Sequence, residues 1–218
     1  MSLAELGASV IRIDPLEGGV DYHRWPVTDT GTSLYWAGLN KGKKSVSIDI
    51  RSAEGRELAQ AIITAPGPDA GIFVSNFPAA GWLDFEGLKK LRDDLIMVNI
   101  VGNRDGSTAL DYTVNCAVGF PQVTGTAGET APTNHVLPAW DLICGMTAAT
   151  GLLAAERYRR LHKAGQLLKS PFPMSRSPSS AISASSRKCR SMASRGSGTA
   201  TIFTAPSGMI LSPGMAGV

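Results

Sequence analysis

Short runs of β-branched residues alternate with segments of helical periodicity between Val10 and Ile100, and this alternation constrains the fold more than any other feature of the chain. Such a pattern is typical of βαβ units on a parallel sheet. We therefore predict an α/β fold, with a Rossmann-like parallel sheet and flanking helices. The predicted strands are rich in Val and Ile and cover residues 10–14, 45–50, 71–75 and 95–101.

Three segments between and after these strands have the apolar spacing of helices. Residues 52–64 predict a helix with Ser52 as its N-cap, and residues 85–93 predict a shorter helix. Residues 142–160 predict the longest helix. Its predicted buried face shares an i, i+3, i+4 spacing and consists of Leu142, Met146, Ala149, Leu152 and Leu153.

Residues 2–9 have the pattern of the last turns of a helix that leads into the first predicted strand. A parallel sheet normally has an earlier strand and a loop at this point. We therefore expect the natural N-terminus of the protein to be missing from this chain.

Composition fits one globular domain, with or without an appendage, because 43% of the 218 residues are hydrophobic and 18% are charged. Cys116, Cys144 and Cys189 are widely spaced and form no C-x-x-C pair, which argues against a disulfide framework or a zinc site and favours a cytoplasmic protein. The longest weakly polar run, residues 142–155, is shorter than the roughly 18 residues that a membrane-spanning helix needs. We expect no membrane segment and no secretory leader.

Charge divides the chain near Leu168. Up to that residue there are 15 Lys and Arg against 18 Asp and Glu, a net charge of −3. Residues 169–218 contain six Lys and Arg, no acidic residue and 13 serines, a net charge of +6. A basic, serine-rich segment of this kind is typical of a disordered arm that contacts nucleic acid. We therefore treat residues 1–168 as one partial domain and residues 169–218 as a tail.

Asp141 is the strongest candidate for a catalytic residue. It follows the apolar stretch His135 to Trp140, which would remove water from one side of the carboxylate, and the helix after it would direct free N–H groups and its positive dipole end toward it. Such an environment keeps a dehydrated carboxylate ionised and able to attack an electrophile. The structural alternative is a simple N-cap, the usual role of an Asp before an apolar-periodic segment.

Five segments, taken in order and spacing, resemble the family III CoA-transferases, also called the CaiB/BaiF family. The resemblance covers residues 1–168. The segments that carry it are residues 6–14, 40–45, 52–58 and 75–77, together with the helix that begins near Asp141.

The resemblance implies that Asp141 attacks an acyl-CoA thioester and forms an aspartyl mixed anhydride with release of CoA thiolate. Residues 18–26, 35–41, 111–115 and 134–141 are most similar to a branch of the family in which both carboxylates belong to one C5 dicarboxylate, so that CoA moves from C1 to C4 of mesaconate. No permanently bound cofactor is implied, because coenzyme A is part of the acyl-CoA substrate. The family also implies an interlocked homodimer, with neither a membrane nor nucleic acid as a partner.

Five further residues match positions that contact CoA in the family. Ile48 and Arg51 match positions that pack on the adenine and approach the phosphates, although a core Ile and a surface Arg would explain them equally well. Asn76 and Phe77 follow a predicted strand, where α/β proteins bind ligands, but an Asn-Phe turn with a buried ring is the default without the resemblance. Arg24 matches a recurrent Arg after a glycine-rich turn and could equally be structural.

Other polar residues have weaker claims to a function. Lys41, Lys43 and Lys44 suggest phosphate binding, but we favour a solvated turn before a strand. The histidines show neither metal-ligand spacing nor a nearby acidic pattern, so we assign no catalytic role to His23, His135 or His162.

An α-methylacyl-CoA racemase is the alternative enzyme class within the resemblance. Racemases of the family place a proton-transferring His immediately before the Asp that matches Asp111, because inverting an α-carbon requires a base on each face. Leu110 stands at that position here, which disfavours a racemase.

Residues 169–218 have the character of a frameshifted tail. Reading Lys169 to Ala184 from each third base of permitted GC-rich codons gives VSLSDVALAVIGHLG, and the same treatment from Thr199 gives GNYLYGAFGHDF; both resemble the continuation of the family. We therefore predict a non-native, disordered tail and a truncated, inactive chain that exposes a sheet edge and an apolar face. The remaining alternative is a non-catalytic fragment whose basic tail binds a polyanion.

Overall fold

The computed structural model describes residues 1–126, 128 and 131–171. The chain divides into two compact units, which are described separately. Among the described residues, the first unit consists of residues 1–73, 79–96 and 156–165, and the second of those within 74–78, 97–155 and 166–171. Helices and parallel strands make up both units, so the predicted α/β class is confirmed.

A two-stranded parallel sheet lies in the first unit. Helix α1 (Ser2–Glu5) precedes strand β1 (Val10–Asp14), and helix α2 (Leu34–Leu39) leads to strand β2 (Lys43–Ser47). Val10 is paired with Lys43, and the pairing continues to Asp14 with Ser47. The prediction for β1 is confirmed residue for residue.

The prediction for β2 is wrong by two to three residues at each end. Lys43 and Lys44 belong to the strand, because their backbones pair with Val10 and Ile11 of β1. Lys44 is exposed and Lys43 is half-buried, and burial lowers the pKa of Lys43. The expected solvated turn therefore contains only Lys41 of the three lysines.

Helices α3 (Ala53–Ile63) and α4 (Phe85–Leu91) also lie in the first unit, with the short 3-10 helix η1 (Gly81–Leu83) before α4. Ser52 caps α3 as predicted, since its Oγ accepts a 2.9 Å hydrogen bond from the Gly55 N–H. The carboxylate of Asp84 caps α4 in the same way by accepting from Gly87 N–H at 2.9 Å.

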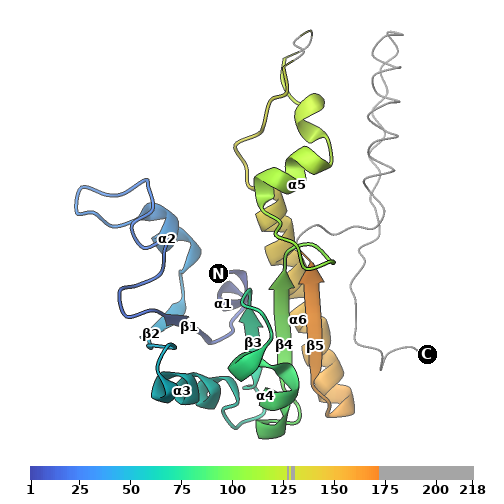
Figure 1. Ribbon diagram of the computed structural model, residues 1–218. Helices are drawn as coiled ribbons and strands as arrows, with labels where there is room; N and C mark the ends of the chain where they lie inside the picture. The colour runs from blue at the N-terminus through green and yellow to red at the C-terminus, as the bar shows by residue number, and fades with distance from the viewer. Residues whose placement is uncertain (127, 129–130, 172–218) are drawn as a thin grey trace. The chain divides into compact units, whose positions relative to one another are not determined.

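Strands β3 (Ile72–Ser75), β4 (Ile96–Val101) and β5 (Gln166–Pro171) form a second sheet in the order β3-β4-β5. All three arrows point the same way in Figure 1. The predictions for β3 and β4 are confirmed to within one residue. The described strands thus form two sheets instead of the single sheet that was expected.

Strand β5 was not predicted, and it continues three residues past Leu168. Its side chains alternate between half-buried, buried and exposed positions, with Leu168 and Pro171 buried. The remainder of the predicted tail, from residue 172 onward, lies outside the described residues.

Helix α5 (Asp111–Ala117), the 3-10 helix η2 (Phe120–Gln122) and the long helix α6 (Ala139–His162) follow β4. The predicted buried face of α6 is wrong, because Leu142, Met146 and Leu153 are exposed. Small side chains instead form most of the buried stripe, which consists of Cys144, Ala148, Gly151, Leu152, Ala155 and Arg159. Alanines let a helix approach its neighbours closely, so the larger apolar residues of α6 are left on the opposite side.

Each unit has its own hydrophobic core. In the first unit the buried apolar residues come from α3, η1, α4 and the ends of neighbouring strands: Ile48, Ala59, Ile63, Leu83, Phe85, Leu88, Leu95 and Ile96. In the second unit they come from β4, α5, α6 and β5: Met97, Val98, Val114, Cys144, Ala148, Leu152, Ala155 and Leu168.

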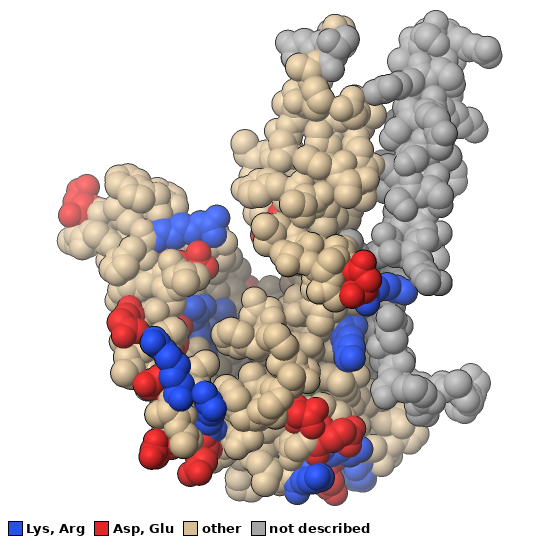
Figure 2. All heavy atoms as spheres, viewed as in Figure 1, with Lys and Arg blue, Asp and Glu red and all other residues tan. Residues whose placement is uncertain are grey.

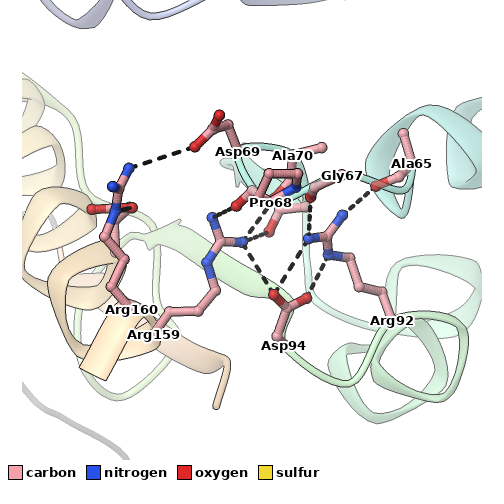
Figure 3. A network of polar contacts seen from close by, with 11 residues as sticks. Ala65, Gly67, Pro68, Asp69, Ala70, Arg92, Asp94, Arg159 and Arg160 are labelled. Atoms are coloured by element: carbon pink, nitrogen blue, oxygen red, sulfur yellow. Dashed lines mark hydrogen bonds and ion pairs between the residues drawn. The ribbon is translucent and has the colours of Figure 1, made fainter. Parts of the chain in front are cut away.

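A buried arginine ties the end of α6 to the rest of the first unit (Figure 3). Arg159 is 4% exposed and donates to the carbonyls of Ala70, at 2.7 Å, and Gly71, at 3.3 Å. Its guanidinium also lies 3.9 Å from the carboxylate of Asp94. The same carboxylate forms an ion pair with the guanidinium of Arg92 at 2.6 Å. Arginine side chains at the ends of α4 and α6 therefore hold the loop before β3.

Charged side chains are unevenly distributed over the surface. On the face drawn in Figure 2, acidic and basic groups intermingle around α3 and α4, whereas the surface of α5 is nearly free of them. The sequence contains no Lys or Arg between Arg104 and Arg157. Among the helices that the structure describes, none has the length and apolar character needed to cross a bilayer.

Replacing the buried arginine should destabilise the chain. Arg159→Met keeps most of the side-chain volume but leaves the carbonyls of Ala70 and Gly71 without the charged donor that Arg159 supplies, so we expect the free energy of unfolding to fall by about 2–3 kcal/mol. Arg160→Met is the matched control, because Arg160 is largely exposed and pairs with Glu156 and Asp69 at the surface. Its effect should stay below about 1 kcal/mol. Equal losses in urea denaturation would contradict the role given to Arg159.

Candidate active site

Asp141 is the third residue of α6, which begins at Ala139. The first helical hydrogen bond runs from Leu142 N–H to the carbonyl of Pro138 at 3.1 Å, so Pro138 occupies the cap position. The N-cap alternative for Asp141 is therefore wrong. Its carboxylate lies in the first turn, where the helix dipole favours a negative charge.

The cap of α6 comes from another helix. Asp111, the first residue of α5, accepts hydrogen bonds through one carboxylate oxygen from the N–H groups of Trp140, at 2.8 Å, and Asp141, at 3.2 Å. These are the second and third N–H groups of α6, which a capping side chain normally satisfies. Proline has no side-chain acceptor, so the distant Asp111 takes over this task.

Asn115 lies one helical turn after Asp111 and is fully buried. Its side-chain oxygen faces the indole Nε1 of Trp140 and the Nε2 of His135, each at 3.2 Å, while its amide donates to the side-chain oxygen of Asn134. The Trp140 ring also stacks on Phe120 with centroids 5.8 Å apart. The segment that leads into α6 is therefore fixed by α5 at several points.

The water-excluding role expected of the stretch before Asp141 is not realised in this chain. Val136 is 99% exposed and Leu137 is also exposed, so neither covers the carboxylate. Asp141 itself is exposed. The polar contacts of Asn115 orient the stretch before Asp141. The side chains of Val136 and Leu137 point outward as a result. Dehydration of Asp141 therefore requires a surface other than residues 136 and 137.

Cys144 lies one turn after Asp141 and is buried. Burial is the main cause that raises the pKa of the Cys144 thiol; a hydrogen bond with Ser170 opposes the rise, and the negative charge of Asp141 adds to it. The thiol therefore stays protonated at neutral pH and fits a packing role.

The loop after β3 holds the predicted residues Asn76 and Phe77, both exposed. The alternative of an Asn-Phe turn with a buried ring is wrong, since Phe77 is 57% exposed. Asn99 of β4, only 2% exposed, donates from its amide to the carbonyls of Ser75, at 3.2 Å, and Phe77, at 2.7 Å. This clamp orders the loop and leaves its side chains available to a ligand.

The remaining predicted residues, Arg24, Ile48 and Arg51, lie in the first unit. Arg24 bonds to the carboxylate of Asp21 at 3.2 Å and lies 4.1 Å from the ring centroid of Tyr35. Arg51 is highly exposed and lies 3.8 Å from Asp49.

Ile48 follows β2 and is buried, and its N–H donates to the Asp14 carbonyl at 2.9 Å. Little of its surface is open to an adenine ring, which fits the core alternative. The structure brings Asn76 and Phe77 together in one loop and pairs each arginine with a carboxylate nearby in sequence.

The sequence analysis gave no structural role to three buried polar residues, Asn99, Asp111 and Asn115, although residues 111–115 contributed to the family resemblance. Asp111 and Asn115 are spaced i, i+4, a spacing that places two residues on one helix face, but no apolar periodicity predicted α5. Across the described residues, no cluster of His, Cys, Asp and Glu has a geometry that could hold a metal ion.

Comparison with known proteins shows that the chain matches one protein family. The chain matches CoA-transferase family III over residues 1–181, beyond the boundary expected at Leu168. It is 59% identical over 170 residues to 2-methylfumaryl-CoA isomerase of Chloroflexus aurantiacus, covering 78% of this chain and 42% of that protein. It is 28% identical over 169 residues to succinate–glutarate CoA-transferase of Agrobacterium fabrum, covering 70% and 41%. The chain thus spans about two fifths of the length of these relatives.

A solved structure shows the same fold. A CAIB/BAIF family protein from Brucella suis superposes with a TM-score of 0.70 at 24% sequence identity, covering 90% of this chain and 53% of that one.

Removing the Asn99 clamp should loosen the loop after β3. In Asn99→Ala the carbonyls of Ser75 and Phe77 lose their donor, and we expect amide exchange across residues 74–80 to accelerate roughly tenfold. Asn103→Ala is the control, because the Asn103 amide bonds to the exposed Ser107 hydroxyl at 2.9 Å. Unchanged protection in Asn99→Ala would contradict the clamp.

The thiol of Cys144 can report the charge of Asp141. The carboxylate raises the pKa of Cys144, so Asp141→Asn should lower that pKa, increase the thiolate fraction and speed alkylation at pH 8. Asp105→Asn, an exposed carboxylate in the same unit, should leave the rate unchanged. The alkylation rate is measured by mass spectrometry of the Cys144 peptide in the parent chain, Asp141→Asn and Asp105→Asn. Identical rates in these three proteins would show that the charge of Asp141 does not act on the Cys144 thiol.

Proposed function

Because the chain belongs to CoA-transferase family III, we propose that this protein moves CoA between carboxylates through a covalent intermediate on Asp141. We further propose that mesaconyl-CoA is its substrate and that both carboxylates belong to that one molecule. The reaction is then the one that the name of the 59% identical relative, 2-methylfumaryl-CoA isomerase, describes.

The placement of Asp141 is the observation that carries this proposal. Its side chain is exposed in the first turn of a 24-residue helix. The N–H groups at that helix start are occupied by Asp111, so the Asp141 carboxylate is not needed as a cap. The helix dipole favours a negative charge in this first turn, and an exposed carboxylate can reach a substrate and act as a nucleophile.

The proposed reaction proceeds by successive acyl transfers. The Asp141 carboxylate attacks the C1 thioester, the carbon–sulfur bond breaks, and an aspartyl mixed anhydride forms with release of CoA thiolate. The thiolate then attacks the Asp141 carbonyl, giving an aspartyl-CoA thioester and freeing the C1 carboxylate.

The C4 carboxylate next attacks that thioester, which forms a second anhydride and releases the thiolate again. Attack of the thiolate at C4 yields the isomeric CoA ester and restores Asp141. Every step exchanges one acyl bond for another, so no oxidant, metal or net proton is consumed.

The surroundings of Asp141 indicate that protein surface beyond this chain contributes to catalysis. An exposed carboxylate in water is a weak acyl acceptor, and a dehydrated one is more reactive. Four large apolar side chains on one face of α6, those of Leu142, Ile143, Met146 and Leu153, are exposed. Exposed apolar faces of this kind are typical of interfaces. We propose that a further part of the subunit, or the second subunit of a homodimer, covers this face.

That covering would also complete the site, and we expect the 218-residue chain alone to be inactive or nearly so. The CoA contacts that the resemblance assigns to Arg24, Ile48, Arg51, Asn76 and Phe77 stay predictions.

Activity can be tested in a graft. In this grafted enzyme, the 170 residues that match the Chloroflexus aurantiacus isomerase replace their counterpart in that enzyme. The grafted enzyme is assayed on mesaconyl-CoA by chromatography of the two CoA esters. We expect turnover, and a loss of at least about a thousandfold in kcat for Asp141→Asn, as when other covalent nucleophiles are removed. Asp105→Asn is the matched control and should retain full activity.

Two results would contradict the proposal. One is an active graft whose turnover is unaffected by Asp141→Asn. The other is exchange of the α-proton of a 2-methylacyl-CoA with solvent deuterium, which a racemase catalyses and a CoA-transferase does not.

A further inference from the structure

We propose that Asp111 is a positioning residue for Asp141: its buried carboxylate fixes the first turn of α6 and thereby the direction of the nucleophile. This inference rests on the proposed function for its catalytic consequence. The hydrogen bonds that carry it come from Trp140 N–H, at 2.8 Å, and Asp141 N–H, at 3.2 Å. The second of these belongs to the nucleophile's own backbone.

The start of α6 has a specific need for this carboxylate. Helix starts leave N–H groups without intrahelical partners, and a side chain at the cap position usually accepts from two of them. Pro138 occupies that position and offers no acceptor. Without Asp111 the N–H groups of Trp140 and Asp141 would form hydrogen bonds to water, and the first turn of α6 would fray.

Burial makes Asp111 a rigid anchor. The residue is 5% exposed, and as the first residue of α5 it is fixed by that helix's backbone. A buried carboxylate requires hydrogen bonds or positive charge. No Lys or Arg lies between Arg104 and Arg157, so in this segment the two N–H groups and the positive end of α6 supply that stabilisation.

Asn115 reinforces the same anchor one turn later on α5. It faces the Trp140 indole and the His135 ring at 3.2 Å each, so the residue before Asp141 is held by both its backbone and its side chain. With Trp140 fixed at two points, Asp141 has little freedom beyond its own side-chain torsions. A nucleophile aligned in this way spends more time in a reactive geometry, and a displacement of about 1 Å can cost a hundredfold in rate.

The kinetic test uses the grafted enzyme with three substitutions. Asp111→Ala should lower kcat about 10- to 100-fold while KM for mesaconyl-CoA changes little, because the nucleophile and not substrate binding is disturbed. Asp111→Asn retains an acceptor oxygen, and Asn and Asp are equivalent caps, so it should recover most of that loss. Asp84→Ala removes a comparable cap, from α4 of the first unit, and should leave kcat unchanged.

A full kcat in Asp111→Ala would overturn the inference, as would an equal loss in Asp84→Ala, which would indicate general destabilisation. Asp141→Asn in the same enzyme separates the two proposals. If that variant remains active, the assigned nucleophile is wrong whatever Asp111 does.

A second measurement needs no activity and uses the 218-residue chain. Amide hydrogen exchange, resolved by residue with NMR, should accelerate at Trp140 and Asp141 in Asp111→Ala and return toward the parent rates in Asp111→Asn. Asp84→Ala should affect Gly87 instead. Unchanged exchange at Trp140 and Asp141 in Asp111→Ala would overturn the positioning role even if the grafted enzyme were inactive.

Discussion

The carboxylate of Asp111 satisfies the start of α6, and the geometry of the candidate site depends on this interaction. A helix that begins after a proline has no local side chain to accept its first N–H groups. Asp111 accepts two of them from inside the second unit. One buried polar contact thereby links two helices that are distant in sequence. The cap of α6 comes from Asp111 and not from Asp141, the nucleophile of the proposed chemistry.

Local signals predicted much of the fold. Val10 to Asp14 was found residue for residue because a short run of β-branched residues is a strong strand signal, and the Ser52 cap was found because its hydroxyl acts within three residues. The predicted start of β2 was late because Lys43 and Lys44 resemble a solvated turn. Lys44 is exposed within the strand and Lys43 is half-buried there, so charge alone did not indicate where the strand began.

Interactions between distant residues were not predictable from the sequence in the same way. Asp141 was identified by a family resemblance, whereas Asp111 is tied to it across thirty residues through backbone N–H groups that no pattern encodes. The buried face of α6 was misassigned because Ala148 and Ala155 pack where larger residues were expected. Asn99 holds the loop after β3 through backbone carbonyls, and a single Asn within an apolar strand gives no sign of its partners.

The central claim is that the Asp141 carboxylate accepts an acyl group, and covalent trapping tests it most directly. The grafted enzyme is mixed with mesaconyl-CoA, quenched with hydroxylamine and digested, and the peptides are analysed by mass spectrometry. An aspartyl anhydride or thioester reacts with hydroxylamine to give a hydroxamate, so the account predicts that Asp141 carries this modification only when substrate is present. Turnover without a modified Asp141, or with the hydroxamate on another carboxylate, would contradict it.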